Sequence, residues 1–257
     1  SGAVRVVGKE VLQDPKQRFF NYLLTEDCYV SGGPTNNGGV IFDWFANEFG
    51  DFKNPFDLDQ SMEELISEAS KVPVGSDGLL FLPYLLGERA PIWNANARGV
   101  YFGLNIKHKR QHFVRATIEG ILYEIYSIGK MLEENRAINR LSVNGSFASI
   151  PFCTQLIADI FNKPVSLKQN SHSVGLGTFL LSATEMGIFK SLDEAATSVE
   201  LPDTYTPQKE HQPVYAAYYD IFASLSTKLF DEFEAISTIQ QNNAAMQNSE
   251  AGLAQAT

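Results

Sequence analysis

The sequence predicts an α/β fold with a mixed, partly parallel sheet flanked by helices. Short runs rich in β-branched and aromatic residues alternate with longer segments in which apolar residues recur every three or four positions. Strands that alternate with helices in this way are typical of α/β domains. The chain has 257 residues, 44% of them hydrophobic and 19% charged, which is enough to bury a substantial core.

The first third of the chain is expected to contain strands and turns. Residues 4–7 and 17–30 are predicted strands, and residues 31–34, with two glycines and a proline, are interpreted as a loop. Gly38 and Gly39 then precede a helical pattern of apolar residues. A helix that begins at a glycine-rich turn has unpaired backbone N–H groups and can bind an anion there.

The rest of the chain supplies the alternating elements. Residues 79–86 form a buried strand that bends into a loop, and residues 110–135 form the longest amphipathic helix. Further strands are expected at residues 138–143 and 164–167, and further helices from about residue 59 and at 150–161, 174–187 and 213–236. Residues 1–237 thus form the domain. Residues 238–257, rich in Gln, Asn and Ala, either extend the last helix or form a mobile tail, which we favour.

Composition excludes several classes of function. The formal net charge is −10, and the densest basic stretch, at residues 107–110, is too short for a nucleic-acid footprint. Cys28 and Cys153 are far apart and lack CxxC spacing, so a zinc site or a disulfide framework is not expected, and a reducing compartment fits. No apolar run approaches the roughly 18 residues that span a bilayer. We therefore expect a cytoplasmic protein with neither nucleic acid nor membrane as a partner.

The most specific pattern lies in residues 99–119. The phosphate loop of the Gly-x-x-x-x-Gly-Lys-[Ser/Thr] type, the His-Glu-x-x-His motif and the Gly-x-Ser-x-Gly nucleophile elbow are absent from the sequence. A seven-residue spacer instead separates two groups of residues, Gly99, Tyr101, Gly103 and Leu104 before it and His112, Phe113, Ala116, Thr117, Ile118 and Glu119 after it. This arrangement resembles the second signature of the FGGY family of carbohydrate kinases.

Two further stretches resemble segments of the same family. One is Leu-Pro-Tyr-Leu-Leu-Gly-Glu-Arg-Ala-Pro at residues 82–91, and the other is the glycine-rich turn before a Trp-bearing helix at residues 37–44. The resemblance extends from the first residues to Ile236. It is closest to the gluconate kinase and xylulokinase members, and Gly-Ser-Phe-Ala at residues 145–148 favours the gluconate kinases.

The resemblance implies an actin-like (ribonuclease H-like) ATPase domain, the C-terminal one of two, with ATP and its Mg²⁺ bound between the domains. Matching the family's positions assigns cofactor contacts to Gly39, Asp43, Gly145, Ser146, Phe147 and Ile150. Ser146 departs from the family, which has glycine there, so its Cβ is expected to crowd the nucleoside. Ile150 replaces a polar adenine contact of some relatives and is expected to pack against the base. No residue of this chain is assigned as a metal ligand.

The resemblance also implies that parts of the enzyme lie upstream of Ser1. The family's catalytic Asp and its sugar-binding residues belong to the N-terminal domain, so no catalytic residue is assigned in this chain. The first strand of the C-terminal domain would also precede Ser1. The strand at residues 4–7 is therefore expected to have an unpaired edge that invites association, for example as a homodimer.

Several polar residues are interpreted as structural. Glu88 and Arg89 are expected to form an ion pair that fixes their loop. Glu119 is expected to bond backbone groups or an arginine, and His112 to be a hydrogen-bonded structural histidine. The leading function is then the ATP-binding half of a kinase that transfers the γ-phosphoryl group of ATP to a sugar or sugar acid, with gluconate favoured. The alternative is a non-catalytic actin-like module that binds a nucleotide or a protein.

Overall fold

The computed structural model describes residues 1–49, 58–145, 150–167, 173–199 and 203–255. The chain divides into two compact units, and each is described by itself. Unit 1 comprises Ser1–Ala137 and Pro213–Thr257, and unit 2 comprises Ile138–Gln212. No helix within the described ranges is both long and apolar enough to cross a membrane.

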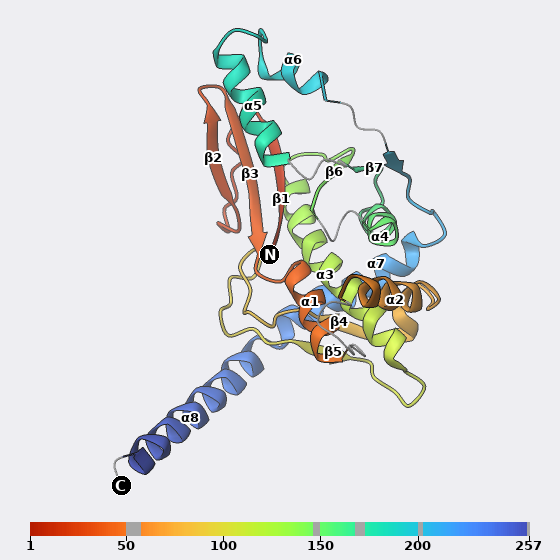
Figure 1. Cartoon of the computed structure of the whole chain (residues 1–257), viewed down its shortest axis with the longest axis vertical. Coiled ribbons are helices and arrows are strands. Elements are labelled where there is room, and N and C mark those ends of the chain that lie inside the picture. The colour runs from red at the N-terminus through yellow and green to blue at the C-terminus, as the bar shows by residue number, and fades with distance from the viewer. Residues whose placement is uncertain (50–57, 146–149, 168–172, 200–202, 256–257) are drawn as a thin grey trace. The chain divides into compact units, whose positions relative to one another are not determined.

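A three-stranded antiparallel sheet begins unit 1 (Figure 1). Strand β3 (Cys28–Thr35) lies between β1 (Gly2–Gly8) and β2 (Phe20–Thr25). The strand predicted over residues 17–30 is therefore two strands joined by a short turn. Successive residues of β1 alternate between half-buried and exposed, as in a strand with one covered face. Among the described residues β1 pairs with β3 on one side only.

The prediction of a loop at residues 31–34 is wrong. These residues complete β3, where Gly32 lies opposite Arg5 of β1. A Cβ atom at Gly32 would overlap with the carbonyl oxygen of Val4. The glycine therefore lets two strands approach closely and does not turn the chain.

Helix α3 is the centre of unit 1. The helices α1 (Gly39–Phe49) and α2 (Leu58–Ser70) precede a hairpin of β4 (Leu80–Leu82) and β5 (Val100–Phe102), and α3 (Arg110–Glu133) follows. The longest predicted helix is thus confirmed, and it contacts β1, β3, β4, α1 and α2. Its buried apolar side chains include Val114, Ile118, Ile121, Leu122, Ile128, Met131 and Leu132.

The C-terminal part of the chain adds two helices where one was predicted. The helix α7 (Gln212–Lys228) ends before Leu229, and α8 (Phe230–Gln255) follows. Figure 1 shows α8 leading away from the other helices of unit 1 to the C-terminus. Since α8 includes most of residues 238–257, this segment extends the last helix. Its mobility and the domain boundary at residue 237 stay predictions.

Unit 2 contains a second three-stranded sheet. Strand β6 (Leu141–Val143) runs parallel to β7 (Val165–Leu167), and β8 (Asp203–Tyr205) runs antiparallel to β7. Its helices are α4 (Pro151–Phe161), α5 (Ser173–Glu185) and α6 (Leu192–Thr197). The buried carboxylate of Asp159 on α4 accepts a hydrogen bond of 2.8 Å from the backbone N–H of Gln208. This bond holds the segment after β8 against α4.

The close approach of α3 to β4 gives a first prediction. A Cβ atom at Gly120 would overlap with the carbonyl oxygen of Phe81. Alanine is the better helix former by about 1 kcal/mol, yet we expect Gly120→Ala to lower the free energy of unfolding by about 1–3 kcal/mol, because the backbone must shift. Urea titration measures this. The control is Gly175→Ala in α5, where a Cβ would meet no described atom within 4 Å, so this variant should be neutral or stabilising. A gain of stability in Gly120→Ala would contradict the described packing of α3 on β4.

Candidate functional site

The predicted contacts Gly39 and Asp43 lie one turn apart on the same side of α1. Gly39 opens the helix and is half-buried, and Asp43, four residues later on the same side, is exposed. The first turn of the helix contains no acidic residue. The first N–H groups of a helix lack intrahelical partners and carry a partial positive charge, so this end can attract an anion.

The preceding glycine, Gly38, is the one that close packing requires. A Cβ atom at Gly38 would lie 2.5 Å from the carbonyl carbon of Ser1 and 2.8 Å from the backbone nitrogen of Gly2. Real Cβ atoms do not approach backbone this closely, so the turn rests directly on the start of β1. Gly39 was selected from the sequence as the functional glycine, and the packing role of Gly38 was missed, although the two adjacent glycines are visible in the sequence.

Glu88 fixes the residues that lead into the turn. The residue is 3% exposed. Its Oε2 accepts hydrogen bonds from the hydroxyl of Thr35 at 2.7 Å and from Nδ2 of Asn37 at 2.8 Å. Its Oε1 accepts from the backbone N–H groups of Asn36 at 3.0 Å and Arg89 at 2.6 Å. Thr35 ends β3, Asn36 and Asn37 follow it directly, and Arg89 belongs to the loop of Glu88 itself.

Asn37 also joins the segment after β3 to the loop of Glu88. The predicted ion pair between Glu88 and Arg89 is absent. Asn37 donates to the carbonyl oxygen of Gly87 at 2.6 Å and accepts from the backbone N–H of Leu86 at 3.2 Å. Arg89 does not pair with the carboxylate beside it; its Nη2 donates to the carbonyl oxygen of Thr35 at 3.1 Å. Its Nε is buried and has no hydrogen-bond partner among the described residues. The loop is fixed, as predicted, but by hydrogen bonds.

The other predicted contacts lie in unit 2. Gly145 follows β6, is exposed and has a φ of 110°, which glycine adopts without strain. Ile150 is half-buried and precedes Pro151, the first residue of α4, and no side chain caps this helix end. Ser146 and Phe147 lie outside the described residues. The six predicted positions therefore fall into two groups, one in each unit.

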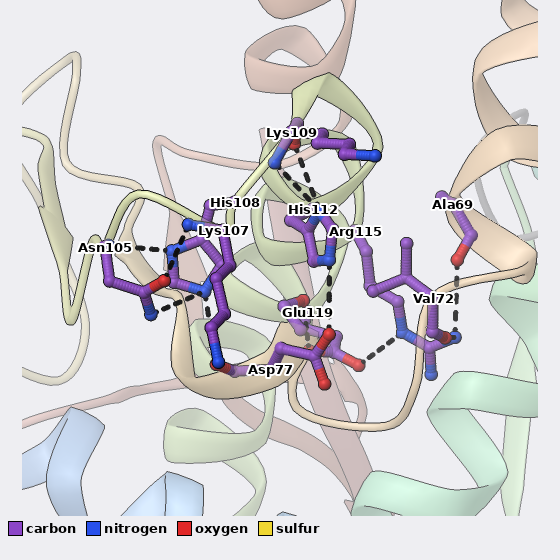
Figure 2. Close-up of polar contacts among 11 residues, drawn as sticks. Ala69, Val72, Asp77, Asn105, Lys107, His108, Lys109, His112, Arg115 and Glu119 are labelled. Atoms are coloured by element: carbon purple, nitrogen blue, oxygen red, sulfur yellow. Dashed lines mark hydrogen bonds and ion pairs between the residues drawn. The ribbon is translucent and has the colours of Figure 1, made fainter.

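The signature segment at residues 99–119 is built around a buried ion pair. Arg115 and Glu119 approach to 2.8 Å, and their side chains are 5% and 2% exposed. Arg115 donates to the carbonyl oxygen of Val72 at 2.7 Å. Glu119 accepts from the backbone N–H of Gly75 at 3.2 Å and the hydroxyl of Ser76 at 3.0 Å. Figure 2 shows Arg115 between Glu119 and the carbonyl groups of Ala69, in the last turn of α2, and Val72, which follows α2. The predicted structural role of Glu119 is confirmed.

Two histidines of the same segment stabilise a left-handed turn at Ser76 and Asp77. Ser76 and Asp77 have φ angles of 53° and 52°, a region that costs a non-glycine residue of order 1–3 kcal/mol. Nε2 of His112 lies 3.2 Å from Oδ2 of Asp77, and Nε2 of His108 lies 3.1 Å from its carbonyl oxygen (Figure 2). Nδ1 of His112 also accepts from the backbone N–H of Lys109 at 3.0 Å. His112 is thus a hydrogen-bonded structural histidine, as predicted, and the segment braces the turn.

A second buried carboxyl group on α3 escaped sequence reasoning. Oε2 of Glu124 accepts from the hydroxyl of Tyr84 at 3.0 Å, and that hydroxyl lies 2.7 Å from Oγ of Ser226. Oε1 is buried and has no hydrogen-bond partner in the described part of the chain. Burial, with the nearby charge of Glu88, raises the pKa of Glu124 well above its ordinary value. The only signal in the sequence is a charged residue among the apolar positions of a helix.

The raised pKa predicts a pH-dependent effect of Glu124→Gln. The folded protein binds this proton more tightly than the unfolded chain, so the stability that protonated Glu124 contributes is complete below pH 4.5 and is lost as the pH rises towards the folded-state pKa. Glutamine resembles the protonated form at every pH. We expect Glu124→Gln to stabilise by roughly 1 kcal/mol or more at pH 8, since a tenfold change in acidity is about 1.4 kcal/mol. Urea titrations at pH 4.5 and pH 8 measure the difference, and an equal effect at both values would contradict the assignment.

Metal and thiol chemistry have no evident site in the described part of the chain. No group of three or more His, Cys, Asp or Glu side chains there could hold a metal ion. Both cysteines are free thiols. Burial raises the pKa of Cys153 to about 12, so its thiol stays protonated near neutral pH and packs as a small apolar group.

The chain is similar to known kinases in sequence. A family model described as the FGGY family of carbohydrate kinases, C-terminal domain, matches residues 3–186. A gluconokinase of Bacillus subtilis is 34% identical over 252 residues, which are 94% of this chain and 48% of that protein. A xylulose kinase of Staphylococcus epidermidis is 31% identical over 214 residues, which are 82% of this chain and 42% of that protein. The chain thus spans about half the length of these relatives.

Solved structures agree with the sequence comparison. The crystal structure of gluconate kinase from Lactobacillus acidophilus matches with a TM-score of 0.82 and 31% identity, over 91% of this chain and 46% of that chain. Ligand-bound xylulose kinase from the same organism matches with a TM-score of 0.81 and 30% identity, over 90% of this chain and 46% of that chain.

Proposed function

This chain belongs to the FGGY family of carbohydrate kinases, as the C-terminal domain of such a kinase, and on that premise we propose that it binds ATP for phosphoryl transfer to a sugar or sugar acid. Its fold is the predicted actin-like one, with a mixed sheet and flanking helices. The observation that carries the proposal is the turn before α1, where a helix start without acidic residues in its first turn is held by Glu88 and by the backbone of Ser1 and Gly2.

The residues present fit a nucleotide, and its Mg²⁺ would be bound with the phosphates. ATP supplies the γ-phosphoryl group for transfer. The N–H groups at Gly39 suit a phosphate because the first N–H groups of a helix lack helical partners, and Asp43 lies one turn further along the same side of α1. In unit 2, a Cβ at Gly145 would meet no described atom within 4 Å, and we propose that this turn contacts the adenosine. The acceptor hydroxyl and the base that deprotonates it are proposed to lie on the rest of the kinase.

Gluconate is the acceptor that we favour. The support is the gluconokinase of Bacillus subtilis, 34% identical to this chain, against 31% for the xylulose kinase of Staphylococcus epidermidis. We place the reaction in the cytoplasm, where thiols such as the free Cys28 stay reduced. Association through the open edge of β1, for example as a homodimer, remains part of the proposal.

Calorimetric titration of the chain with Mg-ATP tests the nucleotide role. We expect saturable binding, and none for Gly39→Asp, which would put a carboxylate at the helix end. The longer kinase that contains this chain is then assayed with gluconate and xylulose, and faster turnover of gluconate is expected. Turnover of xylulose alone would overturn the choice of substrate but not the nucleotide role.

A non-catalytic module that binds a nucleotide or a protein is the second candidate. Ser146, in place of the second glycine of the nucleoside turn, favours it. Ser146→Gly distinguishes the two functions, because tighter binding of Mg-ATP without turnover of gluconate or xylulose in the longer protein would support a binding module. No binding at millimolar Mg-ATP in the chain or in the longer kinase would remove the nucleotide role altogether.

A further inference from the structure

We infer that Glu88 is a positioning residue for nucleotide binding, because it fixes the start of α1 without touching the ligand. This inference rests on the proposed function. Glu88 lies 49 positions beyond Gly39 in the sequence, and its carboxylate reaches back to the three residues that precede the turn, Thr35, Asn36 and Asn37.

The carboxylate is a fully used hydrogen-bond acceptor. Each oxygen of Glu88 accepts two hydrogen bonds, and the donors are two backbone N–H groups, a hydroxyl and a side-chain amide. A buried carboxylate of this kind is stabilised by its donors, and hydrogen bonds to a charged group are stronger than those between neutral groups. The charge therefore holds four separate groups in one arrangement.

The arrangement fixes the turn from two sides. Asn36 and Asn37 are held by Glu88, and the next residue, Gly38, rests on the backbone of Ser1 and Gly2. The first helical residue follows at once. The free N–H groups at the start of α1 are thus oriented before any ligand arrives, and a preorganised site loses less entropy on binding.

Glu88→Gln tests the inference with little change of volume. The amide keeps one oxygen acceptor and brings a donor towards Thr35 and Asn37, so the bond with the Asn37 side chain is lost. We expect about tenfold weaker binding of Mg-ATP by calorimetry, and about tenfold faster hydrogen exchange at the N–H groups of Asn36 and Asn37.

Glu119→Gln is the matched control. Glu119 is also a buried carboxylate of unit 1 that accepts hydrogen bonds from a turn, in its case from Gly75 and Ser76. The variant is expected to lose stability and to speed exchange at Gly75, while its affinity for Mg-ATP stays within twofold of the wild type. A role of Glu88 in stability alone would make the two variants behave alike.

Each outcome bears on the inference. Equal affinity of wild type and Glu88→Gln would overturn it, and so would an equal loss of affinity in Glu119→Gln. If the wild-type chain fails to bind Mg-ATP, the proposed function fails instead. The exchange rates then decide whether Glu88 positions the turn, and unchanged rates at Asn36 and Asn37 would show that it does not.

Discussion

Replacing Arg115 by alanine is expected to lower the free energy of unfolding by about 3–5 kcal/mol. The substitution leaves the carboxylate of Glu119 buried without its cation, and it frees the carbonyl oxygen of Val72 that Arg115 contacts at 2.7 Å. A buried charge that loses its partner is costly because neither water nor another charge replaces it. Urea titration followed by tryptophan fluorescence or circular dichroism measures the change.

Arg110→Ala is the control for this prediction. Arg110 lies on the same helix and forms an ion pair with Glu68 at 3.9 Å, where the side chains are 37% and 41% exposed. Exposed pairs contribute about 0–1 kcal/mol, so this variant is expected to unfold close to the wild type. A loss at Arg115 no larger than the loss at Arg110 would mean that the buried pair does not hold the helix.

Phe81→Ala is expected to cost about 3–5 kcal/mol of unfolding free energy. Phe81 is 2% exposed in β4, and its ring stacks on that of Tyr101 in β5 with centroids 4.3 Å apart. Truncation leaves a cavity between β4 and α3, because the backbone of Phe81 already contacts the helix at Gly120. The measurement is again the urea midpoint at constant m-value.

Phe102→Ala separates burial from the aromatic ring itself. Phe102 is the neighbour of Tyr101 in β5, pairs with Leu80 of β4, and is 47% exposed. Its loss removes a ring from the same hairpin without opening a core cavity, so a change of about 1 kcal/mol or less is expected. Similar losses in the two variants would contradict the described packing of β4.

Sequence predicts the elements that depend on local periodicity. The helix at residues 110–133 is found within two residues of its expected bounds, and a helix follows Gly38 as expected, because one apolar face recurs along each. The glycines of β3 were wrongly interpreted as a loop, because their role depends on a partner strand that is distant in the sequence. Gly32 is set by the backbone of Val4, 28 positions earlier, and such a partner leaves no trace in the neighbouring residues.

At the candidate site, too, contacts between residues that are distant in the sequence could not be predicted. Gly39 and Asp43 were selected by matching a family pattern, and the structure places them one turn apart on the same side of α1. The hydrogen bonds of Glu88 link residues about 50 positions apart, and its expected partner, Arg89, was chosen because the two are adjacent. Whether a buried carboxylate pairs with a cation or with neutral donors depends on the surrounding fold, which periodicity does not describe.

The turn at Ser76 and Asp77 has a consequence for genome surveys. Arg115, Glu119 and His112, three residues within or beside the most recognisable pattern of the family, hold this turn by hydrogen bonds and an ion pair. A relative that had lost the ability to handle nucleotides would still need them to fold. In open reading frames this pattern alone therefore indicates the fold of the domain, and under our inference for Glu88 the glycine turn with its glutamate is the more direct indicator of nucleotide binding.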